Sequence, residues 1–296
     1  MKLTTPVHIA RAADPLRLDE AVCVLGSCFA DEIGAHLADA GFSVLHNPFG
    51  TLYNPASIAA AVERLDSATP FTPADCVGLG AGDGRTGSFS HHTSFARATA
   101  EEFLADANRR LARDAESWRA CSRVIVTLGT ARVWRALERP GAPVVANCLK
   151  RPAREFARER LSVDACAALL RACIAAHPDK RFLLSVSPIR HLGDGARDNT
   201  LSKATLQLAV EQVLDLPNAA YFPACEIVLD ELRDYRFYAD DLVHPSGLAV
   251  RIIWERFLDA CVDPAFHERI RANEQAARAA RHRPRMQNFS EKDLDI

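Results

Sequence analysis

The sequence lacks the segments that mark a membrane protein or an exported protein. No apolar run approaches the roughly 18 residues that cross a bilayer. The first residues, Met1 to Pro6, have neither the apolar core nor the small-residue cleavage site of a signal peptide. We therefore expect a cytoplasmic protein with no membrane span.

An excess of charge of either sign is also missing. The net charge is -2 over 296 residues, and the sequence pI is about 6.6. Nothing in the overall charge therefore predicts attraction to nucleic acid or to an anionic membrane surface. We expect no nucleic-acid partner.

Cysteine pairs at metal-binding spacing are absent as well. The nine cysteines are scattered, odd in number and free of Cys-x-x-Cys pairs, which argues against a zinc site or a disulfide framework. The adjacent His91 and His92 have no carboxylate or cysteine at a convincing ligand spacing, so we expect no metal. Gly26 is not followed by a glycine-rich phosphate loop with lysine, which disfavours a nucleotide enzyme, and we expect no cofactor.

What the chain does have is an alternation of short apolar runs and amphipathic segments. The apolar runs predict strands at 21–27, 42–45, 124–129, 182–188 and 219–223. Apolar residues at helical spacing predict helices at 29–40, 55–65, 99–119, 162–176 and 199–214, and another from 246. The alternation is typical of an α/β fold, a parallel sheet with helices on both faces.

Other segments are harder to assign. Residues 68–98 contain many glycines and resemble a lid or a binding loop, and residues 130–160 are expected to be irregular. A basic helical segment is expected at 264–285. We therefore expect one α/β domain over residues 1–262, followed by a basic helical appendage and tail at 263–296.

The stretch Val22–Asp31 organises the rest of the chain. Apolar residues lead to Gly26, then to Ser27 and Cys28, and a helical pattern follows. Such a turn lies at the carboxyl edge of a sheet, where open α/β sheets bind ligands. The unpaired N–H groups that open the helix favour a developing negative charge, which suits a nucleophile. Alternatively, Gly-Ser-Cys only ends a core strand and Ser27 caps the helix.

The second informative stretch is Asp241-Leu242-Val243-His244. In a loop, Asp-x-x-His can place the carboxylate against one imidazole nitrogen and leave the other nitrogen as a general base. The pattern occurs readily by chance and is weak by itself. Joined to the Gly-Ser-Cys turn, it is a much stronger indication of nucleophilic catalysis.

Together, these two stretches resemble the SGNH (GDSL-like) hydrolase superfamily, whose first block is Gly-Asp-Ser and whose last block is Asp-x-x-His. More specifically, the chain resembles the GSCFA family, which is named for the residues at 26–30. The resemblance covers roughly residues 20–260. It continues in order through the segments 47–50, 127–130, 147–148, 187–191, 221–223, 231–238 and 241–245.

This resemblance implies a three-layer, flavodoxin-like fold of the SGNH hydrolase type. It also implies an esterase or acyltransferase that acts on an acyl group, such as acetyl, of a carbohydrate or related polar substrate. Aligning Gly26 with the glycine of Gly-Asp-Ser makes Cys28 the candidate nucleophile, and Ser27 is the fallback. His244 would move the proton, and Asp241 would orient the imidazole ring of His244. The rival hypothesis is a non-catalytic binding module for a polar or glycan ligand.

The oxyanion donors depart from the superfamily pattern. Gly50 lies where the second-block glycine donates its backbone N–H, and Gly129 keeps the third-block glycine. The asparagine expected after Gly129 is missing, and the loss of one such donor costs about 100- to 1000-fold in rate. Four residues are candidates to replace the missing asparagine as a donor: Asn47, Asn54, Asn147 and His92. Each of them could instead have a purely structural role.

Basic residues are candidates for the mouth of the pocket, where they would hold an anionic group. They are Arg190, His191, Lys203, Arg233 and Arg236. The alternative is that most of them form ion pairs with the nearby acids Asp194, Glu231 and Asp234.

Overall fold

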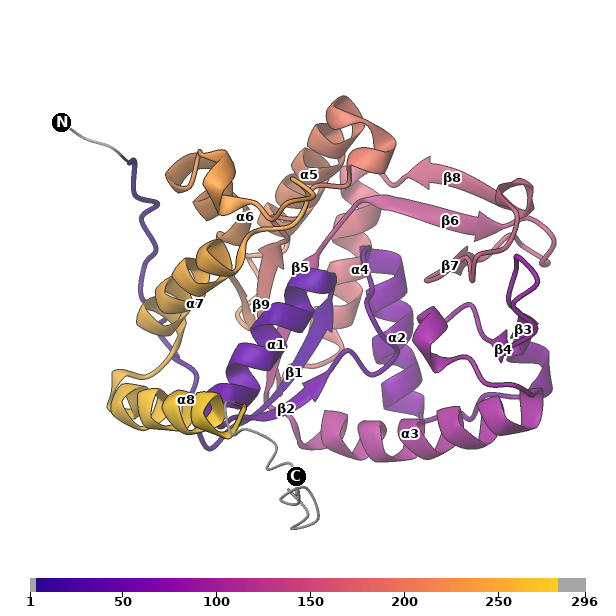
Figure 1. The fold of residues 1–296 in the computed structure, drawn as a ribbon, viewed down its shortest axis with the longest axis horizontal. Coiled ribbons are helices and arrows are strands. Elements are labelled where there is room, and N and C mark those ends of the chain that lie inside the picture. The colour runs from indigo at the N-terminus through magenta and orange to yellow at the C-terminus, as the bar shows by residue number, and fades with distance from the viewer. Residues whose placement is uncertain (1–3, 282–296) are drawn as a thin grey trace, which may run out of the picture.

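The computed structural model of the protein describes residues 4–281 and is built around a sheet of five parallel strands (Figure 1). These are β1 (Ala21–Gly26), β2 (Ser43–His46), β5 (Arg123–Leu128), β9 (Arg181–Val186) and β10 (Ala219–Tyr221). They lie in the order β10-β9-β5-β1-β2, with every pairing parallel. Counted along the chain, this is the order 2-1-3-4-5 of flavodoxin-like sheets. The predicted α/β fold with a parallel sheet is confirmed.

Helices cover both faces of this sheet. One face carries α1 (Cys28–Ala40), α7 (Gly247–Cys261) and α8 (His267–Arg281), with the short α6 (Ala224–Glu226) beside them. The other face carries α2 (Pro55–Ser67), α3 (Ala100–Ala120), α4 (Val163–Ala175) and α5 (Ala196–Glu211). The molecule therefore has three layers, helices, sheet and helices.

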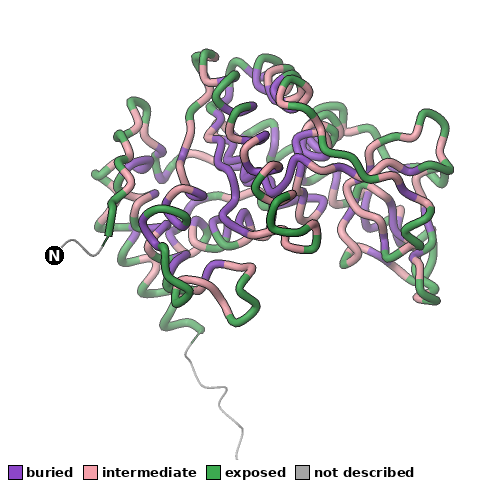
Figure 2. The backbone as a smooth tube through the Cα atoms, turned by 90° about the horizontal axis from the view of Figure 1, so that it is seen from above, coloured by how far each residue is buried: buried purple, intermediate pink, exposed green. Residues whose placement is uncertain are grey.

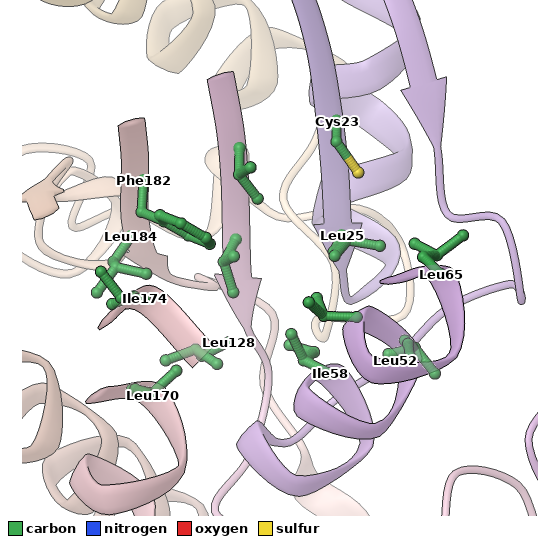
Figure 3. Close-up of a cluster of buried hydrophobic side chains, with 14 of the residues drawn as sticks. Cys23, Leu25, Leu52, Ile58, Leu65, Leu128, Leu170, Ile174, Phe182 and Leu184 are labelled. Carbon is green, nitrogen blue, oxygen red and sulfur yellow. The ribbon is translucent and has the colours of Figure 1, made fainter. Parts of the chain in front are cut away.

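The apolar strands of the sheet explain why both faces are covered. In β1, Cys23 and Leu25 point into one hydrophobic cluster, while Val22 and Val24 belong to the cluster on the opposite face. All four are fully buried, as expected for a central parallel strand. Figure 3 shows Cys23 and Leu25 facing side chains of α2 in the first cluster, and Figure 2 shows the buried residues gathered along the centre of the molecule.

Several helices begin where the sequence places a capping side chain. Asn54 accepts a hydrogen bond from the backbone N–H of Ser57, and Pro55 takes the first helical position of α2. Ser162 and Ser246 cap α4 and α7 in the same way. The helix predicted from residue 199 begins earlier, at Ala196.

The prediction that residues 130–160 are irregular is wrong. They form a three-stranded antiparallel sheet of β6 (Arg132–Ala136), β7 (Val144–Val145) and β8 (Phe156–Arg160). In Figure 1 this sheet extends away from the central sheet, on the opposite side from α7 and α8. Its strands are short and rich in arginine and glutamate because one face is open to solvent, so they lack the apolar runs of the central strands.

The glycine-rich segment 68–98 contains a two-stranded pair, β3 (Val77–Gly78) and β4 (Thr86–Gly87). Val77 and Leu79 form a small apolar cluster with Ala96 and Leu149. His91 is buried among phenylalanine rings, and this burial lowers the pKa of its imidazole to about 3. Much of the expected loop is therefore packed, and His91 is part of its interior.

The predicted basic helix is α8, which packs on α1. Ile270 is fully buried in the same cluster as the α1 side chains, and Asn273 donates to the carbonyl oxygen of Ala40 at 2.8 Å. The expected boundary at residue 262 falls between α7 and α8, whereas residues 282–296 of the predicted tail lie outside the described residues. In the described part of the chain, no helix is both long enough and apolar enough to cross a membrane.

Replacing Gly26 by alanine should strongly destabilise the fold. Gly26 has a φ of +147°, and a Cβ placed on it would lie 2.3 Å from the carbonyl oxygen of Thr127. We expect Gly26→Ala to cost about 2–4 kcal/mol of unfolding free energy, measured by urea denaturation. The matched control is Gly82→Ala, because Gly82 also has a positive φ but has open space around it; it should cost about 1 kcal/mol. Equal losses would contradict a steric role for the contact with β5.

Candidate functional site

The candidate site lies at the carboxyl edge of the sheet, where β1 and β5 end side by side. Gly26 pairs with Thr127, so the residues after each strand emerge next to one another. The connections from β1 and β5 leave toward opposite sides at this point, which makes it the switch point where doubly wound sheets bind ligands. The segment after β9 reaches the same edge, because β9 runs parallel to β5.

Ser27 acts as the cap of α1. Its Oγ accepts a hydrogen bond from the backbone N–H of Phe29 at 3.3 Å and lies 3.3 Å from Oγ1 of Thr127. The side chain has no exposed surface. The capping interpretation therefore describes Ser27, and its buried position argues against it as the nucleophile.

Cys28 is the first residue of α1 and is only partly buried. Its Sγ lies 3.6 Å from the hydroxyl oxygen of Tyr53, which comes from the loop between β2 and α2. Backbone N–H groups in the first turn of a helix have no helical acceptor and attract negative charge. Of the two predicted nucleophiles, Cys28 is thus the one placed to meet a ligand.

Asp241 and His244 are joined as the sequence predicts. Oδ2 of Asp241 lies 2.6 Å from Nδ1 of His244, and Oδ1 accepts the backbone N–H groups of Val243 and His244. These bonds, with that from the backbone of His244 first, lower the pKa of Asp241 to about 2. The carboxylate thus holds one imidazole nitrogen and leaves Nε2 for other chemistry.

Arg190 holds the loop that carries this pair. Its backbone N–H donates to the carbonyl oxygen of Val243 and its Nη1 donates to that of Leu242, both at 3.1 Å. The guanidinium also lies over the ring of Tyr238, 5.6 Å from its centre. The structure therefore gives Arg190 a structural contact in place of the predicted role at the pocket mouth.

His191 lies between the carboxyl end of β5 and the β2–α2 loop. Burial, and after it the positive charges of Lys203, Arg158 and His244, together lower the pKa of its imidazole to about 4. Its Nε2 is buried and has no hydrogen-bond partner among the described residues. His191 is therefore a neutral ring near pH 7, and it cannot hold an anionic group by charge.

A chain of contacts connects the two predicted halves of the site. Cys28 touches Tyr53, whose ring meets that of His191 edge to face at 5.6 Å between centres. The residue before His191, Arg190, donates its backbone N–H to the carbonyl oxygen of Val243, the neighbour of His244, at 3.1 Å. Segments more than 200 residues apart along the chain thus reach one region of the sheet edge.

Gly50 and Asn47 do not supply the predicted oxyanion donors. The backbone N–H of Gly50 is used within a turn, where it donates to the carbonyl oxygen of Asn47 at 2.7 Å. Asn47 accepts the N–H of Gly26 through Oδ1 and donates through Nδ2 to Asp31. Both residues therefore build the turn that supports Cys28.

His92 and Gly129 also serve close packing. A Cβ on Gly50 would lie 2.3 Å from the Cβ of His92, and Nδ1 of His92 caps a short helix by accepting the N–H of Ser94. The N–H of Gly129 donates to the carbonyl oxygen of Tyr53. A Cβ there would lie 3.1 Å from Nε2 of His191, so glycine lets these rings approach.

The other predicted site residues have structural contacts. Asn147 holds a turn by accepting the N–H of Leu149. Lys203 is buried, and its Nζ donates to the carbonyl oxygens of Gly129 and Ser187 at the ends of β5 and β9. Arg236 pairs with Asp234 at 2.7 Å, as the alternative interpretation expects, but within the described residues Asp194 and Glu231 pair with Arg158 and Arg256 and not with the other candidates.

Tyr53 is the site residue that sequence reasoning missed. A single tyrosine in an irregular loop carries no spacing signal, although it follows the Asn-Pro-Phe-Gly segment closely. No cluster of three or more His, Cys, Asp or Glu side chains that could hold a metal ion occurs within residues 4–281.

Comparison with known proteins gives one match. The model of the GSCFA family matches residues 21–257, which include both the Gly-Ser-Cys turn and the Asp241–His244 pair. No curated protein and no solved structure matches the chain. Because the match extends over most of the sequence, the chain belongs to the GSCFA family.

Proposed function

We propose that the protein is an SGNH-like esterase or acyltransferase that acts on an acyl group, such as acetyl, of a carbohydrate or related polar substrate. Cys28 is the nucleophile, His244 moves the proton and Asp241 orients His244. The observation that carries the proposal is the 2.6 Å contact between Asp241 and Nδ1 of His244, in a loop that Arg190 bonds to the segment after β9, at the sheet edge where Cys28 follows β1.

The proposed reaction proceeds through a thioester. His244 Nε2 takes the proton of the Cys28 thiol, and the sulfur forms a bond to the acyl carbon. The carbonyl electron pair moves to oxygen, and its return breaks the bond to the leaving alkoxide, which takes the proton from His244. Water or a second hydroxyl then attacks the thioester carbon while His244 takes its proton. The C–S bond breaks, the acid or new ester leaves, and the Cys28 sulfur takes the proton back from His244. The Asp241 carboxylate stabilises the imidazolium that forms in both steps.

An activated acyl ester should label Cys28. We expect incubation with p-nitrophenyl acetate to give a hydroxylamine-sensitive thioester on Cys28, located by peptide mass spectrometry. Cys28→Ala should abolish this adduct and the release of nitrophenol. Ser27→Ala removes a helix cap, which costs about 1 kcal/mol of stability, but should still form the adduct.

Cys76→Ala is the matched control for this labelling. Cys76 is also a partly buried cysteine, but it lies beside β3, where its Sγ donates to the carbonyl oxygen of Thr72 at 3.9 Å. Its replacement should leave the rate of nitrophenol release unchanged. A wild-type protein that forms no adduct would argue against catalysis, and an adduct lost only in Ser27→Ala would assign the nucleophile to Ser27.

Asp241→Asn should slow acylation by about 100- to 10,000-fold, because the amide no longer fixes the tautomer or stabilises the imidazolium. Asp240→Asn is the control, since Asp240 is an exposed neighbour. The pKa of Asp241, lowered to about 2, adds a pH signature. The carboxylate keeps its negative charge as the pH falls and becomes protonated only near pH 2. Any loss of acylation above about pH 4 must therefore come from the protonation of another group. An Asp241→Asn rate close to that of wild type would contradict the proposed role.

A glycan-binding module without catalysis is the second candidate. It is favoured by the internal use of two N–H groups, those of Gly50 and Gly129, and by the missing third-block asparagine. Calorimetric titration with acetylated and deacetylated oligosaccharides separates the candidates. A binder holds such a ligand equally well in wild type and in Cys28→Ala and releases no acetate, whereas an enzyme releases acetate only with Cys28 present.

A further inference from the structure

We propose that Tyr53 is a catalytic residue, and that its hydroxyl donates the hydrogen bond to the oxyanion that the missing asparagine would otherwise supply. The proposal rests on the proposed acyl chemistry at Cys28. It gives a specific role to a side chain that neither the sequence motifs nor the family match singles out.

The position of the hydroxyl is the first argument. Oη of Tyr53 lies 3.6 Å from Sγ of Cys28. When the sulfur bonds to an acyl carbon, the oxygen on that carbon lies within the same short range of the sulfur. An oxyanion donor works at about 2.7–3.1 Å from that oxygen, which a hydroxyl beside the sulfur can reach with little movement.

The direction of the phenolic proton is the second argument. Oγ1 of Thr51 donates a hydrogen bond to Oη of Tyr53 at 3.2 Å. Because this contact occupies a lone pair of Oη, the proton of Tyr53 is free to point toward the sulfur and the acyl group. Burial, which disfavours the phenolate, raises the pKa of Tyr53 to about 12, so the hydroxyl keeps this proton at neutral pH.

The rigid mounting of Tyr53 is the third argument. Its carbonyl oxygen accepts the backbone N–H groups of both Gly129 and Thr130 at 2.8 Å, which ties the loop to the end of β5. Its ring packs edge to face against His191, and a Cβ on Gly129 would lie 3.2 Å from Cδ1 of Tyr53. Donors fixed before the reaction stabilise a transition state without reorganisation, so this mounting suits an oxyanion donor.

The donors predicted from the sequence are already bonded elsewhere, so they leave the role of oxyanion donor to Tyr53. The N–H of Gly50 is bonded to Asn47, and both side-chain groups of Asn47 are used in the turn. The N–H of Cys28, at the first position of α1, remains as the second donor. In the acylation step, the carbonyl electron pair moves to oxygen, and the resulting oxyanion accepts hydrogen bonds from the Cys28 N–H and the Tyr53 O–H.

The test compares two reactions of the same sulfur. Acylation by p-nitrophenyl acetate forms an oxyanion, whereas alkylation by iodoacetamide does not. We expect Tyr53→Phe to slow acylation by about 100- to 1000-fold while alkylation of Cys28, followed from pH 5 to 10, stays as in wild type. Thr51→Val, which removes only the orienting hydrogen bond, should slow acylation about fivefold. Tyr235→Phe, at an exposed tyrosine, is the control.

The outcomes distinguish this proposal from the function on which it rests. A wild-type protein that forms no Cys28 adduct overturns both. Acylation at the wild-type rate in Tyr53→Phe, with the adduct still on Cys28, overturns the role of Tyr53 alone. A parallel shift of acylation and alkylation to higher pH also overturns it, because Tyr53 would then act on the thiolate and not on the oxyanion. Unchanged alkylation shows that Cys28 is correctly placed in the variant.

Discussion

The geometry of the site depends on the hydrogen bonds around Gly26. Its N–H donates to Oδ1 of Asn47, its carbonyl oxygen accepts the N–H of Leu52, and the next N–H, of Ser27, donates to the carbonyl oxygen of Thr127. One turn is thus bonded to the end of β5 and to both ends of the β2–α2 loop. A side chain at position 26 would collide with β5, so the start of α1, and with it Cys28, is fixed by the absence of a Cβ.

The same loop is bonded a second time at Tyr53, whose carbonyl oxygen receives two N–H groups from the residues after β5. Lys203 extends this network by joining the carbonyl oxygens of Gly129 and Ser187, although burial lowers the pKa of its ammonium group to about 8. A buried cation is costly unless carbonyl or carboxylate groups surround it. Its ammonium group thereby joins the segments that follow β5 and β9.

The sequence was sufficient for the parts of the molecule that depend on local pattern. Apolar runs predict the five central strands, and Asn54 and Ser162 predict helix starts, because burial and capping act over a few residues. The bond between Asp241 and His244 was predictable for the same reason, since the two residues are only three positions apart.

Features that depend on how distant loops meet could not be predicted in this way. The N–H of Gly50 and the amide of Asn47 look available in the sequence, but a turn consumes both. Tyr53 carries no motif and gains its importance only by facing Cys28 across the sheet edge. The strands of 130–160 were missed because β8 ends in three consecutive exposed charged residues, 158–160, so apolar content alone did not mark it.

The two halves of the site differ in how firmly they are held. Backbone hydrogen bonds attach Tyr53, and Ser27 next to Cys28, to the end of β5. The side chains of Asp241 and His244, in contrast, are 50% and 45% exposed. Their loop is tied to the body through Arg190, which contacts backbone carbonyls and the face of Tyr238. In the proposed reaction, a substrate that covers this loop removes water from the carboxylate–imidazole pair and strengthens their attraction. In this proposal the nucleophile and its oxyanion donors are therefore positioned by the fold itself, and the proposed acid–base pair reaches its full strength only when substrate is bound.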